Sequence, residues 1–130
     1  MYNQKIMDIF TSQENMGEIR TANAIGEAGS ASLGDILKFY MVVEDEKIVD
    51  AKCKAFGSAV AIAVGSVCAQ SLIGKTLTQA LELDINQVVE ELGEIPENKK
   101  HCLVAAKEAI ATAVNYYYKK QEKAEKEEVK

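Results

Sequence analysis

Residues 54–63 read KAFGSAVAIA, and the chain changes from strand to helix within this run. Before it, residues 35–43 and 47–56 alternate and are rich in strand-forming side chains. A polar turn at 44–46 joins them, so they predict a β-hairpin. After it, residues 59–73 are almost wholly apolar or small. Too many of them are apolar for a surface helix, so we expect a central helix that is buried on most sides.

The rest of the chain predicts further helices around this unit. Residues 2–13 read as a short amphipathic helix. Residues 14–34 hold four glycines and predict a loop, with one poorly patterned edge strand at most. Capping signals and helical spacing predict three later helices, at 76–83, at 84–93 and from 99–102 to 118. The sum is an α+β fold, in which helices pack on one face of a small antiparallel sheet.

Length and composition indicate a single domain. The chain has 130 residues, and 48% of them are apolar, which is enough to bury a core. We assign residues 1–118 to this domain. Residues 119–130 alternate lysine and glutamate with almost no apolar side chain, so we expect a charged, solvated and frayed C-terminal tail.

Composition also argues against several classes of partner. A formal net charge of −5 does not suit nucleic acid, because phosphate binding needs a basic surface. The sequence lacks a run of about 18 apolar residues, so we expect no membrane span. Its three cysteines are an odd number without close spacing, which makes a disulfide framework a poor interpretation. We therefore expect a protein of the reducing cytoplasm.

His101, the only histidine, directly precedes Cys102. Imidazole and thiolate both bind zinc and iron, and neighbouring residues reach one metal most easily at an irregular helix start. Pro96 places the pair near such a start, and Lys99 and Lys100 add positive charge. Free backbone N–H groups there should lower the cysteine pKa. The alternative is a half-buried cysteine beside an incidental surface histidine.

Two further polar residues stand at the starts of predicted elements. Asp35 follows Gly34 at the start of a predicted strand, where its carboxylate can accept hydrogen bonds from nearby backbone N–H groups. Ser58 precedes the apolar helix, and we interpret it as the N-cap. Of the other cysteines, Cys68 lies inside the predicted buried helix, and both Cys53 and Cys68 are interpreted as small core residues.

Three segments together resemble the IscU/NifU family of iron–sulfur cluster assembly scaffolds, of the NifU N-terminal domain type. They are Gly34-Asp35, residues 54–63 and residues 95–102, which read IPENKKHC. The resemblance covers about residues 2–118. It implies a three-stranded sheet with helices on one side and a metal site at one end, with Asp35, His101 and Cys102 as ligands. Two of the family's three cluster cysteines are replaced here, by Leu33 and Ser58.

The resemblance implies a scaffold rather than a turnover enzyme, and no catalytic residue is predicted. It implies a cysteine desulfurase as sulfur donor and apo iron–sulfur proteins as acceptors. A [2Fe–2S] cluster needs about four protein ligands, mostly thiolates. With Cys102 alone, we expect iron or a cluster to bind weakly or between two chains of a homodimer, or no cofactor at all. The alternatives are a persulfide-accepting or zinc-binding sulfur-transfer partner that uses Cys102, and a degenerate, non-catalytic partner-binding module.

Overall fold

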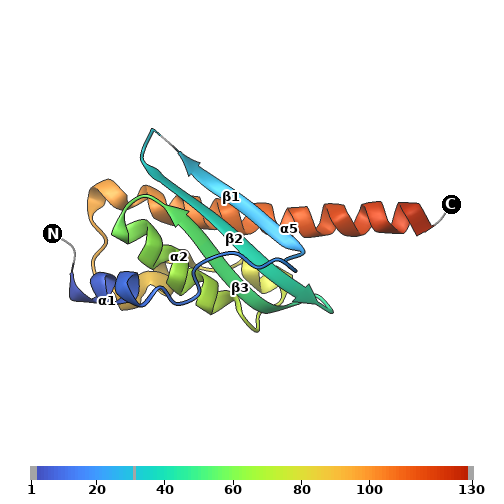
Figure 1. The fold of residues 1–130 in the computed structure, drawn as a ribbon, viewed down its shortest axis with the longest axis horizontal. Coiled ribbons are helices and arrows are strands. Elements are labelled where there is room, and N and C mark those ends of the chain that lie inside the picture. The colour runs from blue at the N-terminus through green and yellow to red at the C-terminus, as the bar shows by residue number, and fades with distance from the viewer. Residues whose placement is uncertain (1–2, 31, 129–130) are drawn as a thin grey trace.

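The computed structural model describes residues 3–30 and 32–128 (Figure 1). Its sheet has three antiparallel strands in the order β1-β2-β3, and the predicted hairpin at 35–56 is confirmed. The strands are β1 (Ala24–Ser30), β2 (Asp35–Glu44) and β3 (Lys47–Phe56).

The edge strand β1 comes from the glycine-rich segment that the sequence only weakly marked as strand. Its strand pattern is poor because Gly26 has no side chain, and the backbone of the last helix fills the space that a core side chain would take. A Cβ atom built there would lie 2.2 Å from the carbonyl oxygen of Ala109 and 2.3 Å from the backbone nitrogen of Ala113. Glycine therefore permits the last helix to lie directly against the strand.

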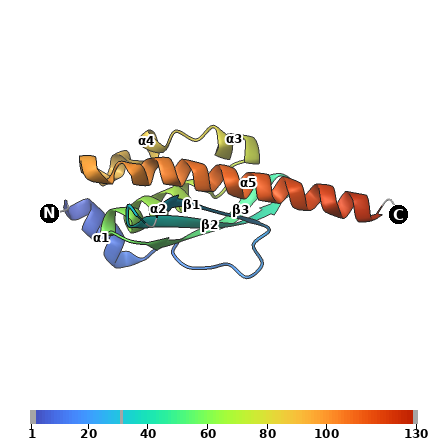
Figure 2. The ribbon, with the colours of Figure 1, turned by 90° about the horizontal axis from the view of Figure 1, so that it is seen from above.

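The helices pack on one face of the sheet, as predicted. Figure 2 shows α5 (His101–Glu128) between the sheet and the segment that carries α3 (Leu77–Leu81) and α4 (Ile85–Val88). The predicted helix at 2–13 corresponds to α1, although Tyr2 lies outside the described residues. The helices are α1 (Gln4–Ser12), α2 (Ala59–Leu72), α3 (Leu77–Leu81), α4 (Ile85–Val88) and α5 (His101–Glu128), with 3-10 turns η1 (Val89–Leu92) and η2 (Glu97–Lys99).

Helix α2 is the centre of the core, as its composition predicts. Most of its residues are buried, and the hydroxyl of its buried Ser66 donates a 2.6 Å hydrogen bond to the carbonyl oxygen of Glu14. Cys53 and Cys68 are fully buried in the same core. Burial raises the pKa of the Cys68 thiol to about 12, so this cysteine stays protonated and acts as a small apolar side chain.

Helix α5 is longer than the sequence predicts, because it continues beyond Tyr118 to Glu128 and projects past the sheet (Figure 1). Lysine and glutamate are good helix formers, and pairs four residues apart support the exposed turns. The prediction of a frayed end is therefore wrong for residues 119–128, whereas its exposure is confirmed for 119–125. Val129 and Lys130 lie outside the described residues. Within the described chain, no helix is long and apolar enough to cross a membrane.

The two ends of the sheet are built differently. At one end, hereafter the hairpin end, Glu44 pairs with Lys47 and the backbone N–H of Ile48 donates to the carbonyl of Lys75 at 2.8 Å. At the other, hereafter the site end, Ile36 pairs with Phe56. This register brings Asp35, the residue before Ile36, close to the turn that leads from β3 into α2.

Candidate metal centre

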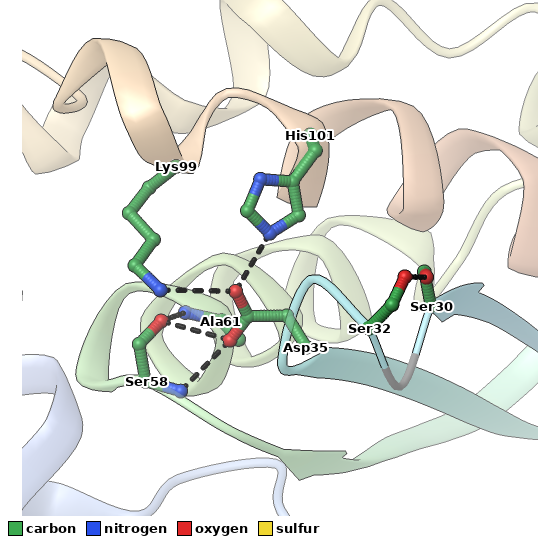
Figure 3. Close-up of polar contacts among 7 residues, drawn as sticks. All are labelled: Ser30, Ser32, Asp35, Ser58, Ala61, Lys99 and His101. Atoms are coloured by element: carbon green, nitrogen blue, oxygen red, sulfur yellow. Dashed lines mark hydrogen bonds and ion pairs between the residues drawn. The ribbon is translucent and has the colours of Figure 1, made fainter.

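Asp35 is the centre of the site end, where side chains from four segments converge (Figure 3). It is the first residue of β2 and is fully buried. Its Oδ2 atom lies 2.7 Å from Nε2 of His101, at the start of α5, and 3.2 Å from Nζ of Lys99, in η2. Its Oδ1 atom accepts hydrogen bonds from the backbone N–H of Ser58 at 2.8 Å and from the Ser58 hydroxyl at 3.0 Å. A buried carboxylate with this many donors is held in one orientation.

The hydrogen bonds keep Asp35 ionised despite its burial. Burial alone would raise the pKa of this carboxyl group, because it disfavours the charged form. The donors from Ser58, His101 and Lys99 outweigh that effect and lower the pKa to about 2 from its usual 3.8. Asp35 is therefore a carboxylate across the physiological pH range and is ready to bind a cation.

Ser58 has the role in the fold that its position predicts. It is the N-cap of α2, and its Oγ atom accepts a 3.2 Å hydrogen bond from the backbone N–H of Ala61. Ser58 can approach Asp35 because the preceding residue is Gly57. A Cβ atom at Gly57, whose φ is +134°, would lie 2.2 Å from Oδ1 of Asp35. The local sequence Gly-Ser thus fits both the helix start and the carboxylate.

Cys102 lies on the buried side of the same cluster. One ligand atom from each of Asp35, His101 and Cys102 can be chosen so that all lie within 4.8 Å of one another. The predicted lowering of the thiol pKa is wrong. Cys102 is fully buried, and this burial, together with the neighbouring Asp35 carboxylate, raises the pKa to about 12. Desolvation and a buried negative charge outweigh the effect of a helix start.

The structure brings together four of the five positions that the sequence singled out. Asp35, Ser58, His101 and Cys102 meet in one cluster. Leu33 lies two residues before Asp35, in the turn before β2, and its side chain is 56% exposed. Lys99 is the partner that the sequence analysis missed, since it treated this lysine only as local charge. Its position two residues before the histidine was the available signal, but the contact with Asp35 spans 64 residues of sequence.

The donors present fit a single divalent ion better than a cluster. An oxygen, a nitrogen and a sulfur ligand are the set of an open zinc-type site, in which three protein ligands leave one position free. A [2Fe–2S] cluster needs about four ligands, mostly thiolates. Cys102 is the one thiol in this group, and the Ser58 hydroxyl is already engaged with Asp35 and Ala61. A cluster held by one chain alone therefore does not fit these residues.

These features define the class: a small α+β domain with a candidate metal centre at one end of its sheet. The family model described as NifU-like N terminal domain matches residues 1–124. The chain belongs to this family, so the resemblance inferred from the sequence is confirmed together with the α+β fold.

Curated relatives agree with this assignment. The chain is 36% identical over 126 residues to iron–sulfur cluster assembly scaffold protein IscU 1 of Archaeoglobus fulgidus, covering 97% of this chain and 82% of that protein. It is equally identical, over 126 residues, to scaffold protein IscU of Aquifex aeolicus, covering 95% and 80%. Among solved structures, a nitrogen-fixing NifU-like protein (N-terminal) from Brucella abortus superposes with a TM-score of 0.65. That pair is 17% identical and covers 91% of this chain and 94% of the other, so it supports the fold alone.

Proposed function

We propose that this protein acts in iron–sulfur cluster assembly as a scaffold that binds one divalent metal ion, iron or zinc, through Asp35, His101 and Cys102. The observation that carries the proposal is the convergence of these three donors within 4.8 Å. The part of the proposal that concerns iron–sulfur cluster assembly is based on the relatives, which are named as assembly scaffold proteins. A cysteine desulfurase as sulfur source and apo iron–sulfur proteins as acceptors complete the proposal.

Each donor has a defined part in binding the ion. Asp35 offers a carboxylate that is already ionised, and His101 offers an imidazole nitrogen. Cys102 binds as a thiolate, and because burial raises its pKa to about 12, binding releases a proton near neutral pH. A bound ion would take the place of the contacts that Lys99 and His101 make with Oδ2 of Asp35. The position that three protein ligands leave free is open to a sulfur ligand from a partner.

The persulfide-acceptor alternative is less well supported by this geometry. Sulfur transfer needs a thiolate that can reach a partner's persulfide. Cys102 has no exposed surface, and its pKa is raised. The thiol therefore becomes a nucleophile only after a metal or a conformational change has altered its surroundings.

Metal titration of anaerobically purified protein tests the proposal. We expect wild type to bind about one Zn²⁺ or Fe²⁺ per chain, as an open three-ligand site would. Cys102→Ser should lose most of this affinity. Cys68→Ala is the matched control, because it removes a buried thiol from the core and leaves the centre intact. Absence of metal from wild type, or equal binding by Cys102→Ser, would contradict the proposal and favour the partner-binding module.

A further inference from the structure

We propose that Ser58 is a positioning residue of this centre, which fixes the Asp35 carboxylate so that a single oxygen, Oδ2, faces the ion. The inference rests on the proposed function and deepens it. The family resemblance implies a cluster cysteine at this position. In this chain the position carries a hydroxyl, which is hydrogen-bonded to the neighbouring ligand Asp35.

Both hydrogen-bond donors of Ser58, its hydroxyl and its backbone N–H, are directed at Asp35. A serine hydroxyl has one proton to donate and lone pairs to accept with. The proton is directed at Oδ1 of Asp35 over 3.0 Å, and a lone pair accepts the N–H of Ala61 over 3.2 Å (Figure 3). The Ser58 backbone N–H donates to the same Oδ1 at 2.8 Å. Both donors of this residue therefore occupy one carboxylate oxygen and leave Oδ2 to His101 and Lys99.

The backbone supports the same contact independently of the hydroxyl. Gly57 has a φ of +134°, and a Cβ atom there would meet Oδ1 of Asp35 at 2.2 Å and the carbonyl oxygen of Gly34 at 2.3 Å. Only glycine leaves room for Ser58 to come this close to the carboxylate. The pairing of Ile36 with Phe56 holds the two segments at that separation.

A cysteine at position 58 would act in the opposite way. As a metal-bound thiolate it has no proton to donate, and its negative charge would lie beside Oδ1 of Asp35. The serine instead stabilises the carboxylate and limits it to one free oxygen.

Co²⁺ binding by two Ser58 variants tests this role, because bound Co²⁺ reports its ligands through its visible absorption. Ser58→Gly retains the backbone N–H and is tolerated as an N-cap, but it lacks the hydroxyl. We expect it to bind Co²⁺ about 10- to 100-fold more weakly, as is typical when a ligand loses its supporting hydrogen bond. Its spectrum at saturation should also differ from wild type. Ser58→Thr retains the hydroxyl and should restore both affinity and spectrum.

Thr76→Gly is the matched control, since Thr76 caps α3 with its hydroxyl and belongs to the hairpin end. It should leave Co²⁺ affinity and spectrum unchanged. Equal affinity and spectrum for Ser58→Gly and wild type would overturn the inference. Weaker binding with an unchanged spectrum would overturn it too, because Ser58 would then act through stability alone. Failure of wild type to bind Co²⁺ would instead overturn the proposed function, and the inference with it.

Discussion

The two ends of the sheet carry polar contacts of similar chemistry in different surroundings. At the site end, Asp35 is fully buried and is held by Ser58 and His101 at 3.0 Å or less. At the hairpin end, the hydroxyl of Tyr118 donates to Oε2 of Glu46 over 3.2 Å in an exposed contact. Water can replace the second contact at little cost, whereas the first cannot be lost without leaving a charge unpaired in the core.

This difference distinguishes polar contacts that only add to the surface of the fold from polar contacts that are arranged for binding. A buried carboxylate with a histidine, a lysine and a thiol beside it destabilises the fold unless every partner is in place. Such a cluster is expected where binding, rather than folding, determines the residues. The predictions below set the site end against the hairpin end.

The largest effect should come from placing thiolates at positions 33 and 58, which the family resemblance implies as ligand positions. Leu33→Cys combined with Ser58→Cys gives the site end three thiolates, together with Asp35 and His101. We expect anaerobic reconstitution to raise cluster content from near zero to about one [2Fe–2S] per chain, because the ligand requirement is then met. Iron and sulfide analysis with visible absorption measures it.

The control for this gain is the same double variant with Cys102→Ser, which should lose the cluster again. A double variant that binds no more iron and sulfide than wild type would show that the site end cannot hold a cluster even when it carries three thiols.

The next effect compares one glycine at each end. Gly57→Ala places a methyl group against Oδ1 of Asp35 and the carbonyl of Gly34 at a φ of +134°. We expect it to lower the free energy of unfolding by at least about 3 kcal/mol, since backbone strain and a buried clash add. Gly74→Ala, with a φ of +92° and open space around the Cβ position, should lower it by about 1 kcal/mol. Urea unfolding measures both, and equal losses would contradict the comparison.

A third test uses pH, with the sign set by the lowered pKa of Asp35. The group is protonated more readily in the unfolded chain, near pH 3.8, than in the folded one, near pH 2. Its contribution of about 2 kcal/mol is complete above pH 3.8 and is lost as pH falls toward 2. Asp35→Asn should remove this part of the acid destabilisation, as followed by urea unfolding from pH 7 to 2. Glu46→Gln, at the hairpin end, should retain this acid destabilisation. Identical curves of unfolding free energy against pH for the two variants would refute the assignment of the effect to Asp35.

The smallest effect is expected from Tyr118→Phe, which deletes the exposed contact with Glu46. The free energy of unfolding should change by no more than about 0.5 kcal/mol, as for other exposed pairs. Metal affinity should not change. A loss of several-fold in metal affinity would mean that the two ends are coupled through α5.

The elements that local pattern determines could be predicted from the sequence. The hairpin and α2 follow from the change of period within residues 54–63, and the helix start at Thr76 from its capping box. The resemblance led to Asp35, His101 and Cys102. The contact between Lys99 and Asp35 could not be predicted, because it depends on tertiary packing across 64 residues. The pKa of Cys102 was predicted in the wrong direction because burial is not visible in a local motif.

X-ray absorption at the zinc edge of protein loaded with one equivalent of Zn²⁺ tests the central claim most directly. Zinc–sulfur and zinc–nitrogen or –oxygen distances differ by about 0.2–0.3 Å, so the technique counts sulfur ligands. We predict one sulfur, from Cys102, with the remaining ligands nitrogen and oxygen. Two or more sulfur ligands per zinc would contradict the account, because they would require a core cysteine or a second chain's Cys102.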